Sequence, residues 1–349
     1  MDQLALIRKP IEEDLTSYLS LFEKDFSHAN PLLNMALQHI LKRQGKRLRP
    51  ILSLLSAKCF DRVDEKVLHA SVSLELLHTA SLVHDDIVDE SDQRRGQKSV
   101  NVLLTPQAAV LIGDYLLSKA LQHSAMTDNV EVVKQISFIG EQLSDGELLQ
   151  LYALDSEEIS EEVYYNIIKR KTASLFSTSA QLGAMLAGAS EEQINAMHLF
   201  GEYLGIAFQI RDDILDYVGD TSLGKPRGND MKEGKLTLPA IYAVNKSRCL
   251  SNFDGSDTAG SSKLSDDSTD SSADNCIYQL ALKVRRTKAT DEEIAKLVSF
   301  TVEQGGLDYA REMMEKYVEM AKAQLNVLPQ SDCIDSLVAF ANLVIKRKV

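Results

Sequence analysis

Helical periodicity runs through nearly the whole chain, and no segment shows a convincing two-residue alternation of polar and apolar positions. Apolar residues that recur every three to four positions indicate amphipathic helices, whereas strands need that alternation between turn signals. Pro31, Pro50, Pro106 and Pro239 stand where helices could begin, and none interrupts a long periodic segment. The pattern predicts an all-α fold, organised as one domain over residues 1–349. The expected helices cover about 11–25, 31–42, 50–60, 64–90, 106–126, 128–151, 157–187, 190–218, 236–246, 276–285, 290–303, 307–327 and 331–346.

Charge and cysteine usage exclude several classes of partner. The chain has 38 Lys and Arg against 51 Asp and Glu, a formal charge of −13, which is the wrong sign for binding a nucleic acid backbone. Its four cysteines form no CxxC pair, so neither a disulfide framework nor a zinc site is indicated. The first 15 residues lack a long apolar core, and no stretch approaches the roughly 20 apolar residues of a membrane span. We expect an untargeted cytoplasmic protein with no nucleic acid partner and no integral membrane span.

Two of the expected helices, within 67–89 and 197–218, are apolar nearly all round and should be buried. Each carries a D-D-x-x-D motif near its C-terminal end. Residues i and i+4 share a helix face, so each motif aims two carboxylates in one direction. Two such groups on facing helices are too negative to stand uncompensated, and Mg²⁺, which prefers oxygen ligands and shares substrate phosphates, would bring in a diphosphate. The motif residues are Asp85, Asp86 and Asp89 in the first helix and Asp212, Asp213 and Asp216 in the second.

A third D-D-x-x-D match, beginning at Asp266, lies in a segment of different character. Residues 247–275 hold nine serines and six aspartates with few large apolar groups. Such a composition cannot build a packed core and predicts a flexible, solvated insertion. Low complexity makes a chance match common, so we assign no site to the third motif.

Basic residues recur beside the two acidic groups, as a diphosphate site requires. They occur in GKRLRP before a helix, in RRG after the first acidic group, in KRKT, and in a glycine-rich loop after the second group. His78 and His84 lie close to the first acidic group, each equally compatible with a core role. Nucleotide-binding glycine motifs, a serine-hydrolase elbow and HExxH are absent. This chemistry favours ionisation of an allylic diphosphate and attack of an alkene on the carbocation.

The motifs GKRLRP, LLHTASLVHDDIVDESDQRRG, KRKTASLF and FQIRDDILDYVGDTSLGKPRGNDMKEGKLTLP together resemble the trans-isoprenyl diphosphate synthases of the polyprenyl synthetase family. The resemblance covers essentially the whole chain and is strongest to octaprenyl and solanesyl diphosphate synthases. It implies an isoprenoid-synthase helix bundle with a central tunnel, usually homodimeric. It also implies a magnesium-dependent, head-to-tail condensation of isopentenyl diphosphate onto an allylic diphosphate, with three Mg²⁺ ions and the released diphosphate accepting the final proton.

The resemblance also implies roles for individual residues. Isopentenyl diphosphate would be held by Lys46, Arg49, His78 and Arg95. The allylic diphosphate would be contacted by Arg94, Lys171, Thr172, Gln209, Lys225 and Lys235, with Lys171 also counted as catalytic. The main magnesium ligands would be Asp85, Asp89 and Asp212, with Asp86, Asp213 and Asp216 supporting them.

Product length is set by how far the growing tail can extend into an apolar tunnel. The side chains one turn before Asp85 are Ala80 and Ser81, both small, where short-chain members of the family typically present an aromatic residue. The helix at 64–90 spans roughly 40 Å, which leaves room for a long tunnel. We expect a long-chain, octaprenyl-like product for quinone biosynthesis. The alternatives are a short-chain farnesyl or geranylgeranyl synthase, a class I terpene cyclase or head-to-head condensing enzyme, and a non-catalytic prenyl-binding subunit.

Overall fold

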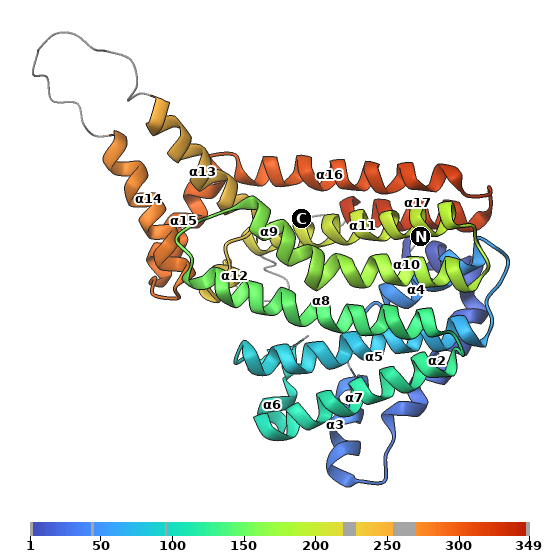
Figure 1. Ribbon diagram of the computed structural model, residues 1–349. Coiled ribbons are helices and arrows are strands. Elements are labelled where there is room, and N and C mark those ends of the chain that lie inside the picture. Colours follow the sequence, from blue (N-terminus) through green and yellow to red (C-terminus); the bar gives the residue numbers. More distant parts are fainter. Residues whose placement is uncertain (1–2, 43–44, 95, 219–227, 254–269, 347–349) are drawn as a thin grey trace, which may run out of the picture. The chain divides into compact units, whose positions relative to one another are not determined.

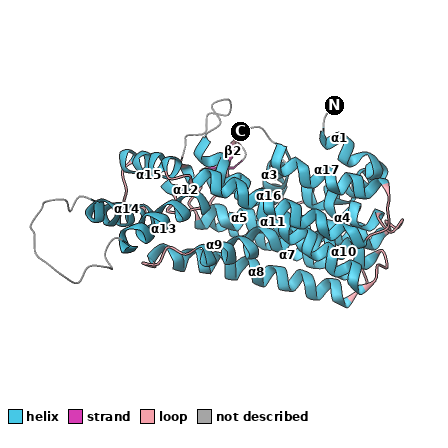
Figure 2. Cartoon of the chain, turned by 90° about the horizontal axis from the view of Figure 1, so that it is seen from above, coloured by secondary structure: helices cyan, strands magenta, loops and turns pink. Residues whose placement is uncertain are grey.

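The computed structural model describes residues 3–42, 45–94, 96–218, 228–253 and 270–346, and these are almost entirely helical (Figures 1 and 2). The all-α prediction is confirmed. The helices are α1 (Gln3–Arg8), α2 (Glu12–Glu23), α3 (Pro31–Lys42), α4 (Leu48–Lys58), α5 (Glu65–Val88), α6 (Val100–Leu103), α7 (Pro106–Met126), α8 (Val130–Asp155), α9 (Glu161–Ile168), α10 (Ser174–Leu186), α11 (Glu191–Val218), α12 (Asn229–Lys232), α13 (Leu238–Phe253), α14 (Asp270–Arg285), α15 (Asp291–Glu303), α16 (Gly306–Gln324) and α17 (Asp332–Lys346). Short 3₁₀ or π turns link some of them: η1 (Lys9–Ile11), η2 (Lys24–Phe26), η3 (Lys169–Ala173) and η4 (Leu325–Val327).

Besides the short helices α1, α6 and α12, which were not expected, three details differ from the sequence expectations. The helix expected at 157–187 is two helices, α9 and α10, joined by the π-helical turn η3. A small antiparallel hairpin, β1 (Gln93–Arg94) with β2 (Gln97–Lys98), follows α5, and two-residue strands are too short to show an alternating pattern. The insertion expected over 247–275 overlaps the end of α13 and the start of α14, because helix continues to Phe253 and resumes at Asp270. The rest of that expected insertion, residues 254–269, lies outside the described residues.

Contacts between residues divide the chain into two compact units. The first contains Met1–Asp145, Lys169–Gly205 and Val318–Lys346, and the second contains Gly146–Ile168, Ile206–Tyr317 and Arg347–Val349. In the first unit α5 packs along α7, and α4 packs against α10. In the second unit α13 packs against α9, α14 and α15. Sequence patterns do not decide whether these units act as one domain, so the single domain with a central tunnel stays a prediction.

Burial of α5 follows from its composition. Asp64 begins the helix by accepting hydrogen bonds from the backbone N–H groups of Lys66 and Val67. Apolar side chains over most of the helix surface are buried, and the buried Ser73 hydroxyl is satisfied by donating to the Ala120 carbonyl at 2.7 Å. The prediction that this apolar helix is interior is confirmed. Among the described residues, no helix is both long enough and apolar enough to cross a membrane.

Candidate active site

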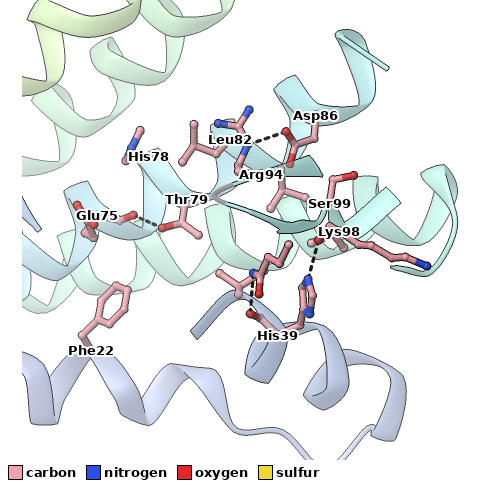
Figure 3. A pocket seen from close by; sticks show the side chains of 14 residues that line it. Phe22, His39, Glu75, His78, Thr79, Leu82, Asp86, Arg94, Lys98 and Ser99 are labelled. Atoms are coloured by element: carbon pink, nitrogen blue, oxygen red, sulfur yellow. Dashed lines mark hydrogen bonds and ion pairs between the residues drawn. The ribbon is translucent and has the colours of Figure 1, made fainter. Parts of the chain in front are cut away.

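The first acidic motif stands at the C-terminal end of α5, in the first unit. Asp85 and Asp86 lie in the last turn of the helix, and Asp89 is its C-cap. Asp86 is buried, whereas Asp85 and Asp89 are partly exposed. The Asp86 carboxylate accepts a hydrogen bond from Nε of Arg94 on β1 at 2.6 Å (Figure 3). Burial raises the pKa of Asp86, and the nearby Arg94 opposes that rise. Asp86 is therefore engaged inside the protein, while its two neighbours lie nearer to solvent.

A pocket of about 620 Å³, part of it open to solvent, lies beside this motif. Its walls come from one face of α5, from α2 and α3, and from the hairpin (Figure 3). His78 and Arg94, both expected to hold substrate, line it together with Asp86. Ala80 and Ser81 are not among its lining residues. Arg95 lies outside the described residues.

The basic segment before α4 belongs to the same unit. Arg47 is the N-cap of α4 and has a left-handed backbone with φ of 55°. Its guanidinium lies 5.6 Å from the centre of the Phe22 ring, at the edge of the pocket. Arg49 lies over the Phe176 ring at 5.1 Å, and the Lys46 carbonyl accepts a hydrogen bond from Arg8 at 3.0 Å. Neither Lys46 nor Arg49 lines the pocket that holds His78.

Lys171 and Thr172 lie in η3, the π-helical turn. Single π turns inside helices are frequent at functional sites, because they displace side chains from the regular helical positions. Both side chains are partly exposed, and the turn is anchored by Arg170, whose Nε lies 2.7 Å from Asp145. Sequence periodicity did not reveal this turn, because five residues are too few to show a pattern of their own.

The second acidic motif, on α11, belongs to the second unit and is held by a different set of partners. Asp213 is buried, and its two carboxylate oxygens accept hydrogen bonds from the Tyr164 hydroxyl at 2.5 Å and from the Gln209 amide at 2.9 Å. Burial raises the pKa of Asp213, and the negative charge of Asp230 adds to the rise. Asp212 accepts hydrogen bonds from the buried Arg211, at 2.5 and 3.1 Å, and remains partly exposed.

The short helix α12 completes this cluster. The Asp216 carboxylate accepts hydrogen bonds from the backbone N–H groups of Asn229 at 3.1 Å and Asp230 at 3.2 Å. Burial, reinforced by Asp216 and Glu233, raises the pKa of Asp230 to about 7. Lys235 lies beyond α12, with Nζ 2.8 Å from Glu233. Lys225 lies outside the described residues.

Three residues of this cluster were missed in the sequence: Tyr164, Arg211 and Asp230. Arg211 directly precedes the acidic motif and Asp230 lies in the glycine-rich loop already noted, so each carried a local signal. Tyr164 lies 49 positions before Asp213 and carried none. That the two acidic motifs face each other stays a prediction, as do the roles of the individual site residues.

The side-chain oxygens of the acidic motifs are of the type that binds Mg²⁺. Asp85 and Asp89 are i and i+4 on one helix, and carboxylate oxygens are the ligands that Mg²⁺ prefers. Within the described ranges, no group of three or more acidic, histidine or cysteine side chains stands ready to hold a metal. A site of this kind would be completed by water and by phosphate oxygens of the substrate, which is usual for Mg²⁺.

Comparison with known proteins identifies the family. The polyprenyl synthetase model matches residues 30–265. The all-trans-nonaprenyl-diphosphate synthase (geranyl-diphosphate specific) of Rhodobacter capsulatus is 33% identical over 347 residues, which cover 98% of this chain and 97% of that protein. The crystal structure of geranylgeranyl pyrophosphate synthase from Bacteroides thetaiotaomicron is 39% identical, with a TM-score of 0.81 and coverage of 99% of this chain and 100% of that one.

A second solved structure, with a TM-score of 0.85 and 27% identity, is polyprenyl synthase from Caulobacter crescentus CB15 complexed with calcium and isoprenyl diphosphate. It covers 99% of this chain and 98% of that one. Fold, motif order and sequence identity agree over nearly the full length. The chain therefore belongs to the polyprenyl synthetase family and, like the divalent-metal-dependent prenyl diphosphate synthases of that family, is a trans-prenyltransferase.

Proposed function

We propose that this protein condenses isopentenyl diphosphate head-to-tail onto an allylic diphosphate to make a long-chain, octaprenyl-like all-trans product for quinone biosynthesis in the cytoplasm. The observation that carries the proposal is the small size of the two side chains one turn before Asp85. Ala80 is buried, with 2% of its surface exposed, and Ser81 is partly exposed. Both side chains are too small to block a growing tail that would pass them.

The acidic and basic residues divide the work of binding. Asp85, Asp89 and Asp212 would hold three Mg²⁺ ions, which when bound supply positive charge against the departing diphosphate. Asp86, Asp213 and Asp216 are engaged by protein donors, which suits a supporting role in orienting the neighbouring carboxylates.

Cationic side chains would bind the two substrates through their phosphates. Lys46, Arg49, His78 and Arg95 would hold isopentenyl diphosphate; Arg94, Lys171, Thr172, Gln209, Lys225 and Lys235 would contact the allylic diphosphate. Arginine suits bidentate contacts with phosphate, and lysine supplies a compact charge. The final proton would pass to the released diphosphate, as the resemblance to the family implies.

Similarity by itself does not choose the chain length. Relatives at 39% and 33% identity are named for geranylgeranyl and nonaprenyl products, respectively. The proposed chain length therefore rests on the small side chains of Ala80 and Ser81 on α5, beside which the growing tail would pass. The Ser81 hydroxyl donates to the His78 carbonyl at 2.9 Å, which turns it back onto its own helix.

We also propose that the protein is a homodimer. Large apolar side chains stand exposed on α7 and α8, among them Leu111 at 68% and Phe138 at 51% exposure. Exposed apolar groups of this kind mark interaction surfaces when they form one contiguous patch. Replacing Leu111 and Phe138 by Lys should give a monomer in size-exclusion chromatography with light scattering; an unchanged mass would reject these helices as the interface.

Mass spectrometry of the products tests the main proposal. The purified protein is incubated with Mg²⁺, farnesyl diphosphate and excess isopentenyl diphosphate. A ladder ending near eight isoprene units supports both the reaction and the chain length. Termination at three or four units keeps the reaction and rejects the long tail path. No elongation from farnesyl, geranyl or geranylgeranyl diphosphate would favour the cyclase or non-catalytic alternatives.

A gate substitution tests the chain length separately. Ala80→Tyr places an aromatic ring one turn before Asp85, so the product should shorten by several isoprene units. Because Ala80 is buried, overpacking there costs about 1–3 kcal/mol, and Ser81→Phe at the partly exposed neighbour provides a milder version. If both variants elongate to the wild-type length, the tail does not pass these residues.

A further inference from the structure

The C-terminal end of α5 makes polar contacts with three other elements of the first unit: β1, α6 and α7. Arg94 of β1 binds Asp86 at 2.6 Å. Asn101 of α6 donates from its amide to the Asp86 carbonyl at 3.2 Å and to the Ser91 carbonyl at 3.4 Å. The third contact is made by His84, which reaches α7 and has no role in the function proposed above.

His84 lies in a notch on α7. Its Nε2 lies 3.3 Å from the Val110 carbonyl oxygen and 3.5 Å from a carboxylate oxygen of Asp114. Because a carbonyl only accepts, Nε2 must carry a proton in the first of these contacts. Between those two residues stands Gly113, where a Cβ atom would fall 2.1 Å from Nε2 and 2.5 Å from Cδ2 of the imidazole. The ring therefore rests directly on a backbone that only glycine leaves bare.

The position of these contacts on the helix matters more than their number. Successive residues of an α-helix are about 100° apart, so Asp85 and Asp89 point within about 40° of each other. His84 and Asp86 lie about 100° to either side of Asp85. Contacts on both flanks oppose rotation of the last turn in both directions.

We infer that His84, seated in the Gly113 notch, is a positioning residue that fixes the direction in which α5 presents Asp85 and Asp89 to a divalent metal. The inference rests on the proposed function, which makes these two aspartates metal ligands. Catalytic geometry is sensitive to displacements of about 1 Å, which can cost about a hundredfold in rate. A displaced imidazole should therefore weaken the metal response before it unfolds the protein.

The chain offers a matched pair of substitutions. Gly113→Ala adds one methyl group that must displace the His84 ring. Gly140→Ala adds the same methyl group on α8, where a Cβ would meet nothing within 4 Å. Gly113→Ala should raise the Mg²⁺ concentration for half-maximal turnover about tenfold and lower kcat. Gly140→Ala should leave both at wild-type values.

A measurement without turnover separates positioning from activity. Wild-type protein should gain thermal stability when Mg²⁺ and inorganic diphosphate are added together, since ligands that bind the folded state raise the melting temperature. Gly113→Ala should lose most of that gain, whereas Gly140→Ala should keep it. A Gly113→Ala protein that is less stable, yet shows the wild-type magnesium dependence and the wild-type thermal gain, would overturn the inference.

Removal of the ring completes a cycle of variants. His84→Ala deletes the contact without adding bulk, so it should weaken the magnesium response even if Gly113→Ala fails to fold. With the ring gone, the added methyl group has nothing to displace, and the double variant should match His84→Ala alone. Losses that simply add would reject the notch. If wild-type protein elongates no substrate but still shows the thermal gain, the proposed function fails while this test remains decisive.

Discussion

Asp86 and Asp213 occupy the same position in two D-D-x-x-D motifs, yet their surroundings differ. Asp86 is paired with a charged group, Arg94, whose side chain is about one-third exposed. Asp213 accepts its hydrogen bonds from the neutral Tyr164 and Gln209, and it lies near another carboxyl group, that of Asp230. Asp86 is therefore paired with a charged donor beside a pocket, whereas Asp213 is held by neutral donors.

The difference shows that a motif indicates which carboxylates are present but not which groups donate hydrogen bonds to them. Arg94 follows Asp86 by eight residues, so the partner of this carboxylate is close to it in the sequence. Tyr164 comes from another helix, 49 residues away. We therefore expect the two motifs to be equally necessary for turnover but unequal in their contribution to stability.

The largest expected effect is a loss of turnover, which tests whether both acidic motifs are needed for the reaction. Asp85→Asn and Asp212→Asn should each reduce magnesium-dependent turnover about a thousandfold, because each removes a charged metal ligand while keeping the side-chain shape. Circular dichroism should remain nearly unchanged. Asp266→Asn, in the third D-D-x-x-D match, is the control and should retain wild-type turnover. Full activity in either site variant would contradict its role as a ligand.

An intermediate effect tests the neutral donors of Asp213. Tyr164→Phe removes the hydroxyl donor while Asp213 stays buried, so the free energy of unfolding should fall by about 1–3 kcal/mol. Urea denaturation followed by circular dichroism measures the change. Tyr152, which is 76% exposed, provides the same substitution as a control, and its variant should stay within about 0.5 kcal/mol of wild type. Equal stability of the two variants would show that the Tyr164 hydrogen bond adds nothing.

The smallest expected effect is a pH dependence of stability that comes from a histidine pair in the first unit. His69 and His123 share a hydrogen bond of 2.7 Å between their Nδ1 atoms, and His123 binds Asp25 at 2.6 Å. Burial lowers the pKa of His69 below its usual value of 6.5. The unfolded chain therefore takes up a proton first, so the stabilising contribution is complete above pH 6.5 and falls as the pH drops toward the folded pKa.

Unfolding at several pH values between about 5 and 8 tests this linkage, since that range brackets the ordinary histidine pKa. His69→Gln should flatten the decline in stability on the acidic side by less than the slope of one full proton. A decline of unchanged steepness in the variant would assign the pH dependence to other groups.

Helical periodicity and apolar composition predicted the all-α fold, the buried α5 and most helix positions. These properties depend on neighbours within a few turns, which the sequence displays directly. The family motifs likewise identified a trans-prenyltransferase, because the order of their acidic and basic groups is a property of the chain itself. Short elements escaped prediction, as the two-residue strands of the hairpin and the π turn that carries Lys171 produce no lasting pattern.

The sequence by itself determined which groups are available: two pairs of carboxylates one helical turn apart, cations beside them, and small side chains before the first pair. Only the tertiary structure decided how each group is held, since the partners come from distant segments. Tyr164 meets Asp213 and Gly113 receives His84 because helices pack side by side, and packing brings together atoms whose separation along the chain leaves no local trace.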